Sequence, residues 1–455
     1  MKTILKKSAV YLIGNFASKI LSSLIIPIYA IYLSSTALGE FDYVQTIMNI
    51  IGPIATLTIW ESVLKFNLDN DSEKAKVETF TNALFVISIS SIVIVLVLLT
   101  YNYYFNIFKT SSFLSITMII LTPFLLLFQY FSRSIKDTVS YIYSGILTSL
   151  VNFAAILILV VYLKTGVFGL VSSYILGQIS GILLIGFRIN IYKFFNIKFI
   201  NFTILKKMLI FSTPLAINTI SLWLINGLSR IIITNSFGLE TNGEFAFAVK
   251  FSTFLSLFAG VINMALIEEA IINAKERTFV NNFQKNFDIL SEIFIYLAIL
   301  FLPVINIFFA FIENTDFSNA YSFIPMIMLG SVFSILSTNL GALFQAIEKT
   351  NLHSISTIVG GIFFIGFSYL MMSTMGVFSV AFGQMVGYFT TFAVRFYFAR
   401  KLVGIKICKN IWMLLIIYIF MAYFYLVKDK LFLILGTILV LFLFIRKLWK
   451  YKINK

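Results

Sequence analysis

Continuous apolar segments of about 20 residues recur along the whole chain, and they constrain the fold more than any other feature. A helix of that length crosses the ~30 Å hydrocarbon core of a bilayer. Transmembrane β-strands are shorter and alternate between apolar and polar positions, whereas these segments are apolar throughout. Charged residues make up 12% of the chain, against about 25% in soluble domains. The pattern predicts an all-α polytopic membrane protein.

These segments predict about 14 membrane-spanning helices. The first is too long for a signal-peptide core and lacks a small-residue cleavage pattern, so it is expected to remain as a helix. The last two are short and separated only by Lys428–Lys430, which predicts either a tight hairpin or a poorly spanning pair. All six prolines fall inside predicted helices, where kinks are expected. The expected spans are 8–33, 42–66, 80–101, 113–132, 139–163, 167–190, 208–234, 244–270, 286–311, 319–347, 353–374, 377–399, 411–427 and 431–446.

The basic residues between the apolar segments predict the orientation of the chain. With a cytoplasmic N-terminus, four of the 34 Lys and Arg fall in external loops, three fall inside helices, and the remaining 27 fall in cytoplasmic segments. Both termini are therefore expected in the cytoplasm, with an even number of helices. This distribution also explains the net charge of +15 without nucleic-acid binding. The external four are Lys109, Lys164, Lys428 and Lys430.

Several function classes are disfavoured by what the sequence lacks. The single cysteine, Cys408, excludes an internal disulfide and most cysteine-based metal sites. The single histidine, His353, has no acid or base partner nearby in sequence, which favours a structural role. There is no P-loop motif, so transport driven by ATP hydrolysis in this chain is not expected. No catalytic residue, metal site or cofactor is predicted.

A short internal sequence repeat predicts two similar halves. Lys6–Lys7 precede the first expected helix and Gly39–Phe41 open the second; Lys206–Lys207 and Gly243–Phe245 stand at the matching places around the seventh and eighth. Two six-helix halves of equal orientation would be related by an axis along the membrane normal. The expected organisation is a six-helix lobe over 1–200, a second over 201–404, and an appended helical hairpin with a basic cytoplasmic tail over 405–455.

Three basic residues inside predicted helices are candidates for binding an anionic headgroup. Ionisable side chains at bilayer depth usually face a cavity or a partner. Lys19 shares a polar face of the first helix with Asn15, near mid-membrane. The alternative is that Lys19 pairs with a buried carboxylate such as Glu61. The other two are Arg230 and Lys250, with the alternative that both reach external headgroups.

Trp223 and Asn226 share one face of the seventh helix with Arg230, so they join the predicted cavity residues. Together with Lys19 and Lys250, these residues would form a basic wall suited to pyrophosphate or acidic sugars.

Other polar residues are candidates for coupling and gating. Glu61, Glu268 and Glu269 lie near the inner ends of predicted helices, where they would bind a coupling proton or sodium ion, or are simply solvated. Gln129 and Arg133 lie four residues apart at the inner end of the fourth helix. They are candidates for a cytoplasmic gate, with a positive-inside anchor as the simpler role of Arg133.

The segment Lys206–Lys250, which contains Pro214, Trp223, Arg230 and Gly243, resembles the bacterial polysaccharide flippases of the Wzx type, the O-antigen transporters. This family belongs to the multidrug/oligosaccharidyl-lipid/polysaccharide exporter superfamily. The resemblance covers roughly residues 8–402. At Ser229 the family often has Asp, which leaves open what orients Arg230. Further similar segments are Asn15, Lys19, Pro27 and Leu38–Phe41, then Phe128–Arg133, then Gly376–Gly383.

The resemblance implies two six-helix lobes around a central cavity in the bacterial plasma membrane, working by alternating access. It implies an undecaprenyl-pyrophosphate-linked oligosaccharide as cargo, flipped for O-antigen or capsule synthesis. Expected partners are this cargo, membrane lipids, H⁺ or Na⁺ as coupling ion, and a polysaccharide polymerase with its chain-length regulator.

Two alternatives remain open. One is an ion-coupled multidrug extrusion antiporter of the same fold, which should carry an acid in its first helix, where this chain has Lys19. The other is a membrane-embedded glycan-modifying enzyme, which usually has a long external loop or a catalytic histidine. The sequence has no long external loop, and His353 lacks an acid or base partner nearby in sequence.

Overall fold

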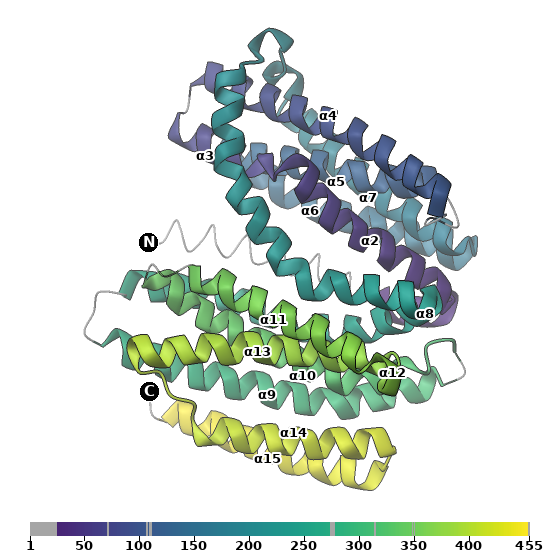
Figure 1. Cartoon of the computed structure of the whole chain (residues 1–455), viewed down its shortest axis with the longest axis vertical. Coiled ribbons are helices and arrows are strands. Elements are labelled where there is room, and N and C mark those ends of the chain that lie inside the picture. Colours follow the sequence, from purple (N-terminus) through teal and green to yellow (C-terminus); the bar gives the residue numbers. More distant parts are fainter. Residues whose placement is uncertain are drawn as a thin grey trace. The chain divides into compact units, whose positions relative to one another are not determined.

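The computed structural model describes residues 25–70, 72–105, 108, 112–273, 278–313, 315–347, 349 and 351–453. These residues are helical apart from short turns, and no β-strand occurs among them (Figure 1). They form two compact units, the first ending at Gly243 and the second beginning at Glu244. The chain is all-α, as the apolar segments predict. The lobe boundaries expected at 200 and 404 stay predictions.

The first unit contains the helices that follow residues 25–32, which are themselves helical. Ser34 accepts a bond from the Ala37 amide and Asp137 one from the Ser140 amide, so each caps a helix start. Helix α6 packs against α7, and α5 packs against both α7 and α3. The elements are α2 (Ser35–Thr56), α3 (Ile59–Asp69), α4 (Glu73–Phe105), α5 (Ser112–Ser134), α6 (Thr138–Ile156) with a π-helical extension (Leu157–Tyr162), α7 (Gly166–Arg188), two 3-10 turns (Ile191–Phe194 and Ile197–Phe199) and the first part of α8 (Phe202–Asn273).

The second unit begins within α8. Helix α13 packs against α10 and α11, while α14 and α15 lie side by side along α9 (Figure 1). The elements are α9 (Phe279–Phe311), α10 (Ala320–Ala346), α11 (Asn351–Leu370), the short α12 (Met372–Met375), α13 (Phe378–Val403), α14 (Lys409–Val427) and α15 (Lys430–Ile453).

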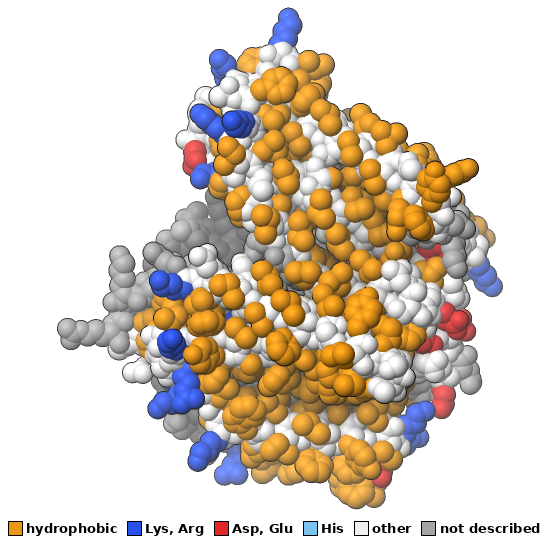
Figure 2. Space-filling model, in the orientation of Figure 1, with side chains coloured by type: hydrophobic (Ala, Val, Ile, Leu, Met, Phe, Trp, Pro, Cys, Tyr) orange, Lys and Arg blue, Asp and Glu red, His pale blue; other side chains and the backbone are white. Residues whose placement is uncertain are grey.

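The helices have the length and composition of membrane spans. Within the described ranges, eight helices are long and apolar enough to cross a bilayer, or nine if α2 and α3 count as one bent span. On the visible face of each unit, hydrophobic side chains cover the flanks of the helices, and Lys and Arg gather toward the ends (Figure 2). The chain is a multi-pass membrane protein. The count of about 14 helices stays a prediction.

The helix expected over 42–66 is broken, which corrects that prediction. Leu57 and Thr58 both have left-handed backbone angles, and α2 meets α3 there at an angle of 51°. Pro53 lies one turn before the break, where its ring and missing N–H weaken the helix. The Thr58 hydroxyl bonds the Ser212 carbonyl of α8 at 3.3 Å, a contact between distant segments that helps to hold the bend.

Two further features of the helices lie near the middle and the end of the chain. Within α8, the helices expected over 208–234 and 244–270 meet at a kink at Gly238, whose backbone is not helical and has φ of 90°. The final two segments form a tight hairpin, one of the two predicted outcomes. Lys428 adopts a left-handed conformation, and Asp429 Oδ1 accepts bonds from the amides of Leu431 and Phe432.

Helix α2 crosses α8 at two glycines that belong to the internal sequence repeat. A Cβ added to Gly39 would meet the carbonyl oxygen of Leu239, and one added to Gly243 would meet that of Ser35. The Asn242 amide donates to the Gly39 carbonyl at 2.9 Å. The two backbones therefore approach as closely as small residues allow in packed membrane helices.

The terminal hairpin is held on its unit by contacts at both ends. Gln284 of α9 accepts a bond from the Lys406 amide at 2.8 Å and donates to its carbonyl at 2.7 Å. Glu292 forms an ion pair with Lys447 of α15. Near the other end, the rings of Tyr321 and Tyr425 stack with centroids 4.0 Å apart.

Candidate functional site

A cavity of about 270 Å³ lies in the first unit at the bend between α2 and α3. Its volume is close to the lower end of the ~300–1,000 Å³ range of small-molecule sites. Four helices line it: α2, α3, α5 and α8. The described lining residues are Met48, Asn49, Gly52, Pro53, Thr58, Trp60, Glu61, Thr122, Pro123, Leu126, Tyr130, Thr219 and Trp223.

Two prolines explain why space opens here. Pro53 in α2 and Pro123 in α5 each remove the helical bond to the carbonyl four residues earlier and push that carbonyl aside. Gly52 lies opposite Pro123, and a Cβ on Gly52 would come within 3.9 Å of the proline ring. The local sequence therefore removes a backbone hydrogen bond from each of two facing helices at the same level of the unit.

Glu61 is the carboxylate of this cavity. Its Oε1 accepts a hydrogen bond from the Tyr130 hydroxyl at 2.8 Å. The Arg133 guanidinium lies over the rings of Tyr130 and Tyr141, 5.1 and 5.3 Å from their centroids. The predicted coupling residue Glu61 and the predicted gate residue Arg133 thus both contact Tyr130, which sequence reasoning did not single out.

Gln129, the other predicted gate residue, has its hydrogen bond on α6. Its amide donates to the Ser144 hydroxyl at 3.4 Å. The structure therefore connects Arg133 to the cavity wall through Tyr130 and places Gln129 in the packing between α5 and α6.

Two tryptophans contribute aromatic surface to the cavity. Trp60 is 5% exposed and packs in a hydrophobic cluster with Val63 and Phe80. Trp223, a predicted site residue, is half-buried on α8. The whole chain has four tryptophans, so half of them line this one cavity.

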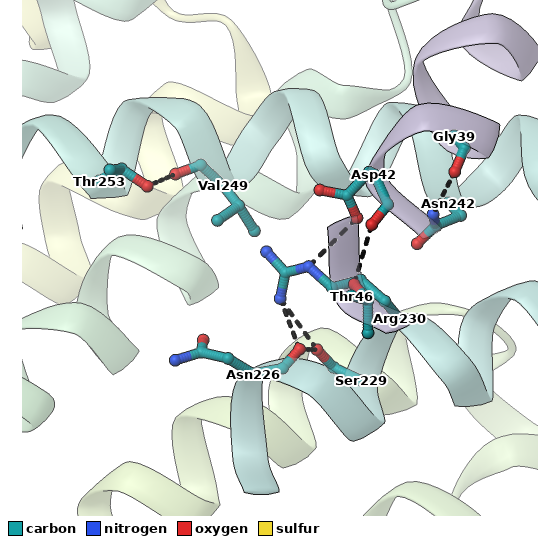
Figure 3. A network of polar contacts seen from close by, with 9 residues as sticks. All are labelled: Gly39, Asp42, Thr46, Asn226, Ser229, Arg230, Asn242, Val249 and Thr253. Carbon is teal, nitrogen blue, oxygen red and sulfur yellow. Dashed lines mark hydrogen bonds and ion pairs between the residues drawn. The ribbon is translucent and has the colours of Figure 1, made fainter. Parts of the chain in front are cut away.

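Arg230 forms a buried ion pair in the same unit (Figure 3). Its Nε lies 3.2 Å from Asp42 Oδ2, and both side chains are 10% exposed. Nη1 donates to the Asn226 carbonyl at 2.6 Å and to the Ser229 hydroxyl at 3.3 Å. Asp42 of α2 thus orients Arg230 in a chain that has Ser229 where the family often has an acid. The signal for Asp42 was its place directly after the Gly39–Phe41 motif.

The remaining candidates are only partly described. Lys250 is half-buried on α8 in the second unit. Asn15 and Lys19 lie outside the described residues, as do the side chains of Glu268 and Glu269. The basic wall of Lys19, Arg230 and Lys250 stays a prediction.

The second unit holds a buried arginine cluster that sequence reasoning missed. Arg395 of α13 is 3% exposed, although the loop-charge pattern assigned it to a cytoplasmic segment. Its Nε donates to Ser356 Oγ at 2.8 Å, Nη1 to the Ser337 carbonyl at 2.8 Å, and Nη2 to Thr357 Oγ1 at 3.0 Å. Nη2 also lies 3.2 Å from both Nδ1 and the carbonyl oxygen of His353. This single guanidinium joins α10, α11 and α13, and it gives His353 a structural contact.

The fold is that of transporters. The chain is similar to an inward-facing multidrug resistance MATE family transporter of the MOP superfamily, with 18% identity, a TM-score of 0.66, and coverage of 86% of this chain and 94% of that one. It is also similar to an outward-facing member, with 17% identity, a TM-score of 0.58, and coverage of 88% and 96%. A mutant of a Vibrio cholerae MATE transporter matches with 16% identity, a TM-score of 0.61, and coverage of 88% and 96%.

The sequence itself matches the family model of polysaccharide biosynthesis proteins over residues 4–267. The chain belongs to this family. A comparison with curated proteins finds no match. The matched range includes the described cavity and the Arg230–Asp42 pair.

Proposed function

We propose that this chain is a flippase that moves an undecaprenyl-pyrophosphate-linked oligosaccharide from the cytoplasmic to the outer leaflet of the bacterial plasma membrane. The released cargo would serve O-antigen or capsule synthesis. The family match over residues 4–267 carries this proposal, because it connects the chain to polysaccharide biosynthesis while the fold connects it to transport.

Alternating access is the proposed mechanism. Fold relatives occur in both inward-facing and outward-facing conformations, which supports a chain that exposes its cargo site to each side in turn. The bias of basic residues toward one set of loops supports a plasma-membrane orientation with both termini in the cytoplasm. A proton or sodium ion bound at Glu61 is the proposed coupling step, with Glu268 and Glu269 as further candidates.

The anionic headgroup is assigned to Lys19, Arg230 and Lys250. Guanidinium groups bind phosphate through paired hydrogen bonds, and a fixed orientation strengthens such contacts. The contacts of Arg230 with Asp42 and with the Asn226 carbonyl fix its orientation in the first unit. Asn15, Trp223 and Asn226 are proposed to line the same path, with Gln129 and Arg133 at its cytoplasmic entrance.

A test begins with deletion of the gene in its bacterial host. Surface polysaccharide should disappear while lipid-linked repeat units accumulate, and the wild-type gene should restore export. Unchanged surface polysaccharide in the deletion strain would refute the flippase proposal. Variants Lys19→Ala, Arg230→Ala and Lys250→Ala should each restore less export than the matched control Lys206→Ala, a substitution at an exposed position.

The multidrug antiporter is the second candidate, favoured by the MATE-type fold and by the carboxylates Asp42 and Glu61 in the first unit. It predicts increased sensitivity of the deletion strain to cationic drugs with normal surface polysaccharide. The same strain therefore separates the two functions.

A further inference from the structure

We propose that the cavity at the α2–α3 bend is a saccharide subsite that holds one neutral pyranose ring of the cargo between Trp60 and Trp223. The proposal rests on the proposed flippase function and specifies which part of the first unit contacts the sugar. It differs from the basic residues assigned to the headgroup, because the cavity lining contains no described Lys or Arg.

Tryptophan is concentrated at this cavity. Half of the tryptophans in the chain line a cavity of about 270 Å³. A pyranose presents C–H groups on its faces and hydroxyls around its rim, and an indole offers a large, flat, amphipathic surface to such a face. Trp60 is held by its cluster with Val63 and Phe80, so its ring is already in place before a ligand enters.

The cavity lining also includes polar groups that have no hydrogen-bond partner among the described residues. Among the described residues, the Asn49 side chain and the Oε2 atom of Glu61 have no hydrogen-bond partner. The hydroxyls of Thr58, Thr122 and Thr219 are already bonded to Ser212, Met48 and Leu215. Asn49 therefore offers two donors and an acceptor, and Glu61 offers an acceptor, beside two aromatic surfaces.

This combination of a few polar groups and apolar walls is typical of a small-molecule site. Adjacent sugar hydroxyls would donate to Glu61 Oε2 and accept from the Asn49 amide. A single carboxylate in the lining disfavours uronic acids through like-charge repulsion. In the described part of the chain, no group of three or more His, Cys, Asp or Glu is placed to hold a metal ion, which separates the cavity from a multi-carboxylate cation site.

The direct test uses intrinsic fluorescence of the full chain in lipid nanodiscs. A Trp412→Phe/Trp449→Phe background leaves Trp60 and Trp223 as the only tryptophans, and excitation at the red edge of the absorption band selects them over the 22 tyrosines. Methyl glycosides of neutral hexoses and of N-acetylhexosamines should produce a saturable change in emission. Glucuronic acid should bind about tenfold more weakly, a loss of about 1.4 kcal/mol, because its carboxylate is repelled by Glu61.

Substitutions locate the effect. In the same background, Asn49→Ala and Glu61→Gln should each weaken binding of the preferred glycoside by about tenfold. Gln45→Ala is the matched control, because Gln45 lies one turn earlier on α2 and is not among the cavity residues. Equal affinities for Asn49→Ala, Glu61→Gln and Gln45→Ala would overturn the assignment of these polar groups.

The outcomes separate the subsite from the flippase function. Export of polysaccharide by the wild-type chain without a saturable signal from any glycoside would overturn the subsite and leave the flippase intact. A signal produced by Na⁺ or by acidification, but by no glycoside, would also overturn it and assign the cavity to a coupling ion. Failure of the flippase proposal would appear separately, as unchanged surface polysaccharide in the deletion strain.

Discussion

Replacing Arg395 by lysine should destabilise the second unit although the charge is kept. The guanidinium distributes its donors over Ser337, Ser356 and Thr357 on two helices, at 2.8 to 3.0 Å. A lysine ammonium has three donors at a single point and cannot reach all of these acceptors from α13. Hydrogen bonds to charged groups contribute about 1.5–3 kcal/mol each, so the loss of one or two predicts a decrease of about 3 kcal/mol in the free energy of unfolding.

This magnitude is measurable as thermal stability in detergent. A change of 1 kcal/mol shifts Tm by about 2–4 °C in a domain of 150–250 residues, the size of the second unit, so Arg395→Lys should lower Tm by about 6–12 °C. Fluorescence-detected size-exclusion chromatography after heating gives the midpoint. Arg400→Lys is the matched control, because Arg400 lies on the same helix and is exposed. Equal midpoints for Arg395→Lys and wild type would refute the inference that guanidinium geometry joins the three helices.

Three other substitutions test contacts described above. Asp42→Ala should lower folded yield, because an unpaired buried arginine costs about 3–5 kcal/mol, and Arg230→Met in the same chain should restore part of that yield, as measured by size-exclusion chromatography. Lys428→Gly should raise Tm slightly, since the left-handed conformation costs a residue with a Cβ about 1–2 kcal/mol; a decrease would show that the lysine side chain stabilises the turn. Glu292→Gln should weaken docking of the terminal hairpin on α9 and increase proteolysis between α13 and α14, which an unchanged digestion pattern would contradict.

The fold class followed from the sequence because apolar length is a local property. Helix ends such as those of α5, α7 and α10 fall within a few residues of the expected spans for the same reason. The break between α2 and α3 did not follow, because Leu57 and Thr58 are ordinary residues whose left-handed geometry depends on contacts with α8. Around Gly238 the sequence predicts a longer non-helical segment than the structure has, since the chain continues as helix on both sides of this residue.

The candidate site was predictable to a similar degree. Arg230 and Trp223 stood out because they share one face of an apolar helix, and Glu61 stood out because carboxylates are rare on apolar helices. Asp42 did not, since its importance depends on a partner far away in the sequence. Arg395 was counted with a cytoplasmic segment because a positively charged residue near a helix end resembles a topology signal, and only the packing of α10, α11 and α13 shows that it is buried.

The crossing of α2 and α8 at Gly39 and Gly243 has a consequence for how this protein can evolve. Every coding change at a glycine adds at least a Cβ, and here that atom would meet main-chain atoms of the opposite helix. A substitution elsewhere can shrink a neighbouring side chain, but it cannot remove a backbone carbonyl. A second substitution therefore cannot relieve the clash. In a saturation library selected for surface polysaccharide, these two codons should therefore retain glycine alone while apolar positions around them drift. Natural variation in the cargo must then be accommodated by side chains such as those that line the cavity, since this backbone crossing has no freedom to change.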